Sequence, residues 1–121
     1  MSPIEPEAVL LPYYAALFVA ILMGVGGQLL FKAGADRSSD ILRQFLDPLT
    51  IIAFAVYAVS AMLYAASLRK LPLSVAFPSV ALSYVAVAFA SHLLWHEPLG
   101  WPRLSGIALI VTGVVLLNLR A

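Results

Sequence analysis

The stretch LPYYAALFVAILMGVGGQLLF, which runs from Leu11 to Phe31, contains no charged residue and decides the fold class. About 20 consecutive apolar residues let an α-helix cross the ~30 Å hydrocarbon core of a bilayer. The stretch therefore predicts a transmembrane helix. Glu5 and Glu7 stand before it where a secretion signal has basic residues, so we expect the helix to be retained and not cleaved.

Three further apolar stretches also predict membrane-spanning helices: Leu49 to Leu68, Leu73 to Trp95 and Trp101 to Leu119. The 121-residue chain is 63% hydrophobic and 11% charged, which is too little polar material to cover a soluble globule. The stretches are continuously apolar, whereas the strands of an outer-membrane barrel alternate. We expect an all-α membrane protein in which residues 1–10 form an N-terminal tail and residues 11–120 a domain of four transmembrane helices.

Composition also argues against several classes of function. The net charge of +1 comes without a dense basic stripe, which argues against a nucleic-acid partner. The chain has no cysteine, and it shows neither metal-spaced ligands, nor a phosphate loop, nor a nucleophile beside a base. We therefore expect no catalytic residue, no metal site and no cofactor.

A polar face on the first predicted helix is the strongest functional signal. Gly24, Gln28 and Lys32 recur at four-residue spacing and so share one face of the helix. We expect no carboxylate near Lys32, and an ionisable group at membrane depth usually faces a partner, a cavity or a substrate. The amide and the ammonium could together bind a phosphate oxygen. Alternatively, Lys32 extends to the interface or pairs with Glu97, and then only anchors the helix.

Hydroxyl-bearing side chains form a stripe on the second predicted helix. Within an arc of roughly 80° lie Tyr57, Ser60, Tyr64 and Ser67. The stripe could line the path of a polar substrate, together with Ser83 and Tyr84 of the third helix. It could equally serve helix packing, through hydrogen bonds worth ~0.6 kcal/mol each.

The third and fourth predicted helices carry signals for bending and for association. Pro78 removes a backbone donor and predicts a kink, which makes it a candidate hinge. We expect His92 to be a packing residue and not a proton relay. Gly106, Thr112 and Gly113 share a face of the last helix, where small residues let backbones approach closely. This face could pack within the bundle, but we expect it to form a dimer interface.

The connections predict local structure but no orientation. Ser39 or Asp40 could cap one or two turns over residues 41–46 that lie on the membrane surface, and Asp47 with Pro48 suits the start of the next helix. Basic residues number three on one membrane face and four on the other, and so nearly balance. Those on the first face are Arg69, Lys70 and Arg120; those on the second are Lys32, Arg37, Arg43 and Arg103.

Four short blocks of sequence are typical of one group of transporters. Residues 106–114 read GIALIVTGV and match G-[LIM]-x-L-I-x-x-G-V, the pattern that closes the last helix of small multidrug resistance transporters. The other blocks are GQLLFKAGA from Gly27, LPLSVAFP from Leu71 and WHEP from Trp95. These resemble the subunits of the aminoarabinose-phosphoundecaprenol flippase, within the drug/metabolite transporter superfamily. The resemblance spans Leu11 to Leu119.

This resemblance implies movement of a polyprenyl-phosphate-linked sugar across the bacterial inner membrane by a homodimer or heterodimer of four-helix subunits. The substrate-binding residues of this hypothesis are Lys32, Gln28, Gly24, Tyr57, Ser60, Tyr64, Ser83 and Tyr84. Drug exporters of the family carry a glutamate where this chain has Gly24, which argues against proton-coupled export of small cations. That function stays open as an alternative, with Glu97 as the nearest acid, as does a non-transporting adaptor that stabilises a partner.

Overall fold

The computed structural model describes residues 7–119, and every regular element in that range is an α-helix. The helices are α1 (Glu7–Asp36), α2 (Ile41–Leu46), α3 (Pro48–Ser67), α4 (Leu73–Val80), α5 (Leu82–Trp95) and α6 (Trp101–Asn118). Four segments are long and apolar enough to cross a membrane: Val9–Asp36, Pro48–Ser67, Leu73–Trp95 and Trp101–Asn118. The predicted all-α class with four spans is therefore confirmed. Residues 1–6 of the predicted tail, and Arg120, lie outside the described residues.

The first helix is longer than the sequence predicts at both ends. It begins at Glu7 and not at Leu11, and it continues to Asp36. Alanine is the strongest helix former, and Ala33 and Ala35 favour an added turn after Lys32. The hydroxyl of Ser38 donates to the carbonyl of Gly34 at 2.7 Å and so satisfies one of the last carbonyls of α1.

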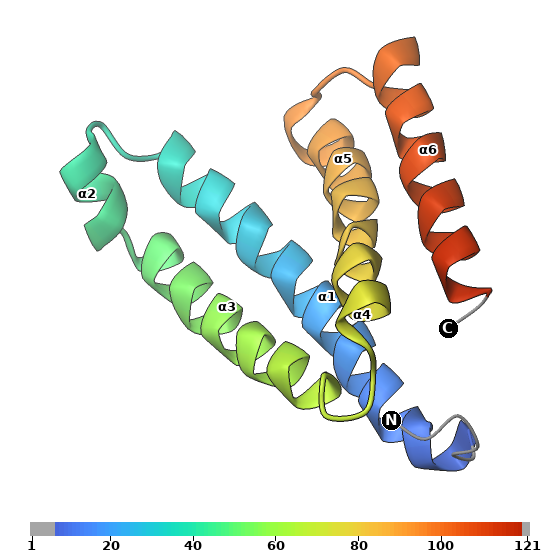
Figure 1. The fold of residues 1–121 in the computed structure, drawn as a ribbon. Coiled ribbons are helices and arrows are strands. Elements are labelled where there is room, and N and C mark those ends of the chain that lie inside the picture. The colour runs from blue at the N-terminus through green and yellow to red at the C-terminus, as the bar shows by residue number, and fades with distance from the viewer. Residues whose placement is uncertain (1–6, 120–121) are drawn as a thin grey trace.

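The helices form a long hairpin with a second group of helices laid against it (Figure 1). α1 and α3 run side by side and make the most extensive contact in the described structure, and α5 packs on α1. α6 packs on α4 and α5, at the edge of the molecule away from α3. The centre of the molecule is therefore bounded by α1, α3, α4 and α5.

Two glycines of α1 allow α3 to approach closely. A Cβ atom on Gly34 would collide with the side chain of Thr50, and one on Gly27 would lie 3.0 Å from the ring of Tyr57. Ala53, between these contacts on α3, is fully buried. Small residues thus join α1 to α3 here, as is usual for helices in lipid.

The third predicted span is interrupted, but not at the proline itself. α4 ends at Val80 and α5 begins at Leu82, two and four residues beyond Pro78. Around the interruption the amide of Ala81 donates to the carbonyl of Pro78 at 2.9 Å, and that of Tyr84 donates to the carbonyl of Ala81 at 3.0 Å. These three-residue bonds tighten the backbone where the four-residue ladder is broken. A hinge role for Pro78 stays a prediction.

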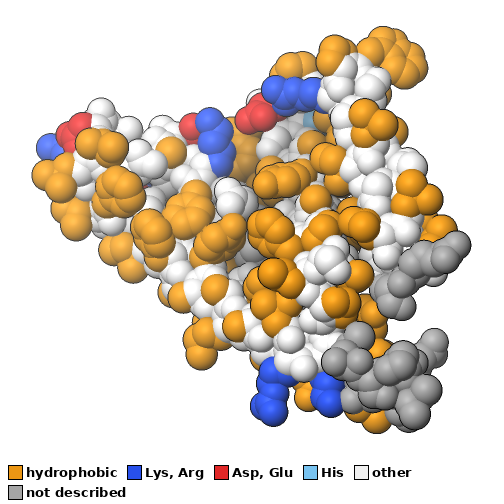
Figure 2. Space-filling view, viewed as in Figure 1, with side chains coloured by type: hydrophobic (Ala, Val, Ile, Leu, Met, Phe, Trp, Pro, Cys, Tyr) orange, Lys and Arg blue, Asp and Glu red, His pale blue; other side chains and the backbone are white. Residues whose placement is uncertain are grey.

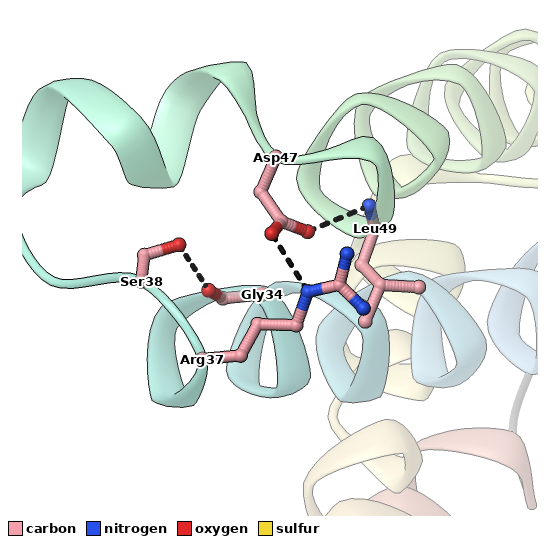
Figure 3. Close-up of polar contacts among 5 residues, drawn as sticks. All are labelled: Gly34, Arg37, Ser38, Asp47 and Leu49. Atoms are coloured by element: carbon pink, nitrogen blue, oxygen red, sulfur yellow. Dashed lines mark hydrogen bonds and ion pairs between the residues drawn. The ribbon is translucent and has the colours of Figure 1, made fainter.

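The connection between α1 and α3 is held by caps and an ion pair (Figure 3). Of the two predicted caps of α2, Asp40 is the one that acts, because it accepts from the amide of Arg43 at 2.9 Å. Asp47 caps α3 by accepting from the amide of Leu49 at 2.9 Å, as predicted. Its other carboxylate oxygen pairs with Arg37 at 2.7 Å. The hydrogen bond from Arg37 is the main cause that lowers the pKa of Asp47, and the amide of Leu49 adds to it.

Apolar side chains are spread over the face of the molecule that Figure 2 shows, and many large ones are exposed. Leu109 and Leu116 of α6 are 74% and 60% exposed, and Ile41 and Leu42 of α2 are 72% and 68% exposed. A soluble protein would not expose so much apolar area. The solvent that suits this surface is lipid. That α2 lies at the membrane interface stays a prediction.

Candidate functional site

A cavity of about 340 Å³ lies between α1, α3, α4 and α5. Its lining residues are Ala20, Ile21, Gly24, Gln28, Tyr57, Ser60, Ala61, Tyr64, Phe77, Val80, Ser83, Tyr84 and Val87. Seven of the eight residues predicted to bind substrate are among them, and Lys32 is the exception. The structure thus brings together side chains from the faces predicted on the first two spans, and it adds Ser83 and Tyr84 of the third.

Some polar side chains of the cavity form hydrogen bonds within the protein, and these bonds differ in whether they lie at the cavity wall. The amide of Gln28 donates to the hydroxyl of Tyr57 at 3.2 Å, across the α1–α3 contact. The hydroxyl of Ser60 donates to the carbonyl of Ala20 at 2.7 Å, and Ser60 is buried. Ser60 therefore serves helix packing in this structure, whereas the Gln28–Tyr57 pair stays at the cavity wall.

The hydroxyl of Tyr64 is buried and has no hydrogen-bond partner in the described structure. A buried hydroxyl without a partner costs free energy, so such groups usually bind another molecule or water. Tyr84 lies across the cavity on α5 and is 67% exposed. Neither of these two phenol groups donates a hydrogen bond within the described structure.

Lys32 has a carboxylate beside it, which corrects the expectation that none would be near. Its ammonium pairs with Asp36 at 3.0 Å, four residues further along α1, and both side chains are nearly half exposed. The expectation was wrong because the apolar stretch ends at Phe31, next to Lys32, whereas the added turn of α1 carries Asp36 onto the same face. Lys32 stands one helical turn beyond Gln28, at the end of the cavity-lining face.

Glu97 does not form the ion pair with Lys32 that the anchor interpretation expected. Its carboxylate pairs with Arg103 at 3.8 Å, while its charge also acts on Lys32. The Nδ1–H group of His92 donates a hydrogen bond to the backbone carbonyl of Glu97 at 2.8 Å. His92 thus fastens the end of α5 to the turn that follows it, a structural role. Figure 2 shows acidic and basic side chains together at this end of the molecule.

The glycine face of α6 is open. A Cβ atom on Gly106 or on Gly113 would meet nothing within 4 Å. Thr112 is exposed, and its hydroxyl donates to the carbonyl of Ala108 in its own helix at 2.7 Å. The predicted interface residues therefore do not pack within their own subunit. The small residues that do pack there, Gly27 and Gly34, were missed, although their seven-residue spacing in α1 is a signal for such a contact.

Comparison with known proteins matches residues 8–119 to the model of the EamA-like transporter family. Among similar relatives, the "Probable 4-amino-4-deoxy-L-arabinose-phosphoundecaprenol flippase subunit ArnE" of Enterobacter sp. (strain 638) is 29% identical over 105 residues, covering 87% of this chain and 95% of the relative. The ArnE of Escherichia coli O45:K1 (strain S88) is 30% identical over 106 residues, covering 87% and 96%.

The "Probable 4-amino-4-deoxy-L-arabinose-phosphoundecaprenol flippase subunit ArnF" of Shewanella sediminis (strain HAW-EB3) is 40% identical over 86 residues, covering 68% of this chain and 59% of the relative. No solved structure matches.

Proposed function

Because this chain belongs to the EamA-like transporter family, we propose that it is a subunit that flips a polyprenyl-phosphate-linked sugar across the membrane. Family membership and four apolar spans make it a multi-pass transporter of the bacterial inner membrane and not an enzyme. The relatives are named for an aminoarabinose joined through phosphate to undecaprenol. A lipid of that class is the substrate that we propose for this chain.

The observation that carries the proposal is a cavity with polar groups on its walls inside a protein with an apolar exterior. A sugar offers hydroxyls, which the Gln28 amide and the phenols of Tyr57 and Tyr84 can bind, and the buried phenol of Tyr64 becomes a further partner if the wall around it opens. The polyprenyl chain can stay in the bilayer, against exposed apolar side chains. Only the headgroup has to cross the membrane, and the cavity supplies what its hydroxyls need.

Lys32 is the residue that we assign to the phosphate. It lies one turn beyond Gln28 on the same face of α1, so a headgroup in the cavity can place its phosphate near both. An ammonium is a strong point-charge donor for phosphate oxygens. The Lys32–Asp36 pair does not prevent this, because an ion pair between half-exposed side chains is weak.

We further propose that two four-helix subunits act together, in contact through α6. The open face at Gly106, Thr112 and Gly113 supports this arrangement, because small residues are the usual basis of helix contact in lipid. The partner would be a second copy or a similar four-helix subunit. Export of a small cation finds no support at this cavity, since none of the described residues that line it is acidic.

Flipping of a labelled polyprenyl-phosphate sugar in proteoliposomes tests the proposal. Lys32→Ala should lower the rate tenfold or more without loss of assembly, and Lys32→Arg should keep part of it. Arg43→Ala is the control, because Arg43 also pairs with a carboxylate of its own helical segment but lies away from the cavity. An unaltered rate in Lys32→Ala would contradict the phosphate role. No flipping by the wild-type protein, alone or with a similar subunit, would contradict the proposal and favour an adaptor.

A further inference from the structure

Four aromatic rings form a row that starts at the cavity wall and ends on α2. The ring centroids of Tyr57 and Phe31 lie 5.9 Å apart, and those of Phe31 and Phe54 lie 4.9 Å apart. Phe45 of α2 follows, with its centroid 6.3 Å from that of Phe54. Of these four residues, only Tyr57 lines the cavity. The aromatic row therefore leads out of the cavity toward α2.

The contacts between the rings leave much of the aromatic row uncovered. Tyr57, Phe54 and Phe45 are 42%, 50% and 51% exposed. α2 does not cover the row, because no residue of this helix is buried. A single aromatic side chain can bury ~150–250 Å² in a contact, so the exposed part of the row is a substantial apolar surface.

The aromatic row passes beside the residue that we assign to the phosphate. Phe31 precedes Lys32 in α1, and successive residues lie about 100° apart around a helix, so their side chains occupy adjoining faces. Tyr57 contacts both faces, since its hydroxyl accepts from Gln28 and its ring lies 3.0 Å from where a Cβ atom of Gly27 would be. The lipid chain of the substrate begins at the phosphate. With the sugar in the cavity and the phosphate at Lys32, that chain starts at the inner end of the row.

From this geometry we propose that the aromatic row binds the first isoprene units of the substrate and selects a polyprenyl chain over a straight saturated one. The inference rests on the proposed function. An isoprene unit has a planar double bond and a methyl branch, and so can lie flat against an aromatic ring, whereas a straight saturated chain has no such flat face. Bulk lipid does not require this surface, because α6 beyond Trp101 exposes apolar side chains to lipid without any aromatic residue.

Binding of two matched lipids to the protein in nanodiscs, alone or with a similar subunit, tests this inference. Both carry the same sugar phosphate; one has a polyprenyl chain and the other a straight saturated chain with the same number of carbon atoms. The wild-type protein should bind the polyprenyl lipid about tenfold more tightly. Phe54→Leu stays apolar but removes the ring at the centre of the row, so it should lose most of this preference. Phe54→Trp should keep the preference, because it restores a flat ring.

Phe18→Leu is the matched control for this experiment. Phe18 is 62% exposed, does not line the cavity and lies roughly 20 Å along α1 from Phe31. The control should keep the wild-type preference. Phe45→Leu, at the outer end of the row, provides the same test where Phe54→Leu does not fold.

Three results overturn the inference and leave the proposed function intact. These are equal affinity of the wild-type protein for the two lipids, a preference that persists in Phe54→Leu, and a preference that falls as far in Phe18→Leu. Failure of the wild-type protein to bind either lipid contradicts the proposed function, and the inference with it.

Discussion

At the scale of single residues, the pair between Arg37 and Asp47 joins the end of α1 to the start of α3 and makes this junction sensitive to acid. Arg37 lowers the pKa of Asp47 in the folded protein. The unfolded chain should titrate near the ordinary value of about 3.9. The stabilisation from this pair is therefore complete above that pH and is lost as the pH falls through the lower, folded pKa.

We predict that Asp47→Asn makes thermal stability less dependent on pH below about pH 4. Asparagine keeps the cap of α3 but cannot ionise. Melting followed by circular dichroism in detergent across this pH range measures the effect. Arg37→Gln should flatten the profile in the same way, since Arg37 is the main cause of the lowered pKa. Equal acid sensitivity in the wild-type protein and both variants would show that the pair does not govern the junction.

At the scale of helices, the α1–α3 contact depends on a missing side chain. Gly34→Ala would place a Cβ atom against Thr50, and its closest neighbours include the backbone nitrogen of Thr50 at 3.2 Å. We predict a loss of about 1–3 kcal/mol of stability from this overpacking. Gly26→Ala is the control, because a Cβ atom at that position would meet nothing within 4 Å. Unfolding in denaturant and detergent compares the two variants.

A second substitution distinguishes overpacking from a general intolerance of alanine at position 34. Thr50→Ala removes the hydroxyl that the new methyl would meet, and this hydroxyl has no hydrogen-bond partner in the described structure. The double variant should therefore regain part of the lost stability. Additive losses in the double variant would mean that the α1–α3 contact at Gly34 is not the cause.

The interruption between α4 and α5 is the second feature at this scale. Phe77 and Val80 line the cavity from α4, and Ser83, Tyr84 and Val87 line it from α5, so bending at Ala81 changes the shape of the cavity. We predict that Pro78→Ala restores the amide donor that proline lacks, stiffens the segment before Ala81 and slows flipping several-fold without unfolding the protein. Pro12→Ala is the control, since Pro12 also lies inside a helix but outside the cavity. Equal rates for both variants and the wild-type protein in proteoliposomes would contradict the hinge role.

At the scale of the whole molecule, much of the architecture was predictable from the sequence because lipid imposes simple rules. A span needs about 20 apolar residues, and the 3.6-residue period places Gly24 beside Gln28 and Tyr57 beside Tyr64. These two rules predicted the four spans and grouped five of the residues that line the cavity, Gly24 and Gln28 on one helix and Tyr57, Ser60 and Tyr64 on another. Neither rule needs knowledge of how the helices pack.

The features that were missed depend on packing or on where a helix ends. Asp36 joins Lys32 only because α1 gains a turn that the apolar pattern does not contain. The contact of Gly34 with Thr50 depends on which face of α1 meets α3, and sequence spacing alone does not choose between several small-residue faces. The same limit applies to α6, where the pattern at Gly106 and Gly113 is compatible with packing inside the subunit or between subunits.

The last prediction addresses that choice for α6. Gly113→Leu adds a large side chain where the isolated subunit has open space, so it should leave the folded subunit intact. In a dimer that packs through this face, the same side chain would hold the two backbones apart. We predict that Gly113→Leu strongly lowers the yield of cross-linked dimer in membranes, that Gly106→Leu does so to a lesser degree, and that melting of the subunit is unaltered. Val111→Phe is the control, because Val111 is exposed and lies well away from both glycines and from Thr112 around the helix. A dimer yield that falls equally in all three variants would reflect added bulk on α6 and not a glycine interface, and an unaltered yield in both glycine variants would place the subunit contact on another helix.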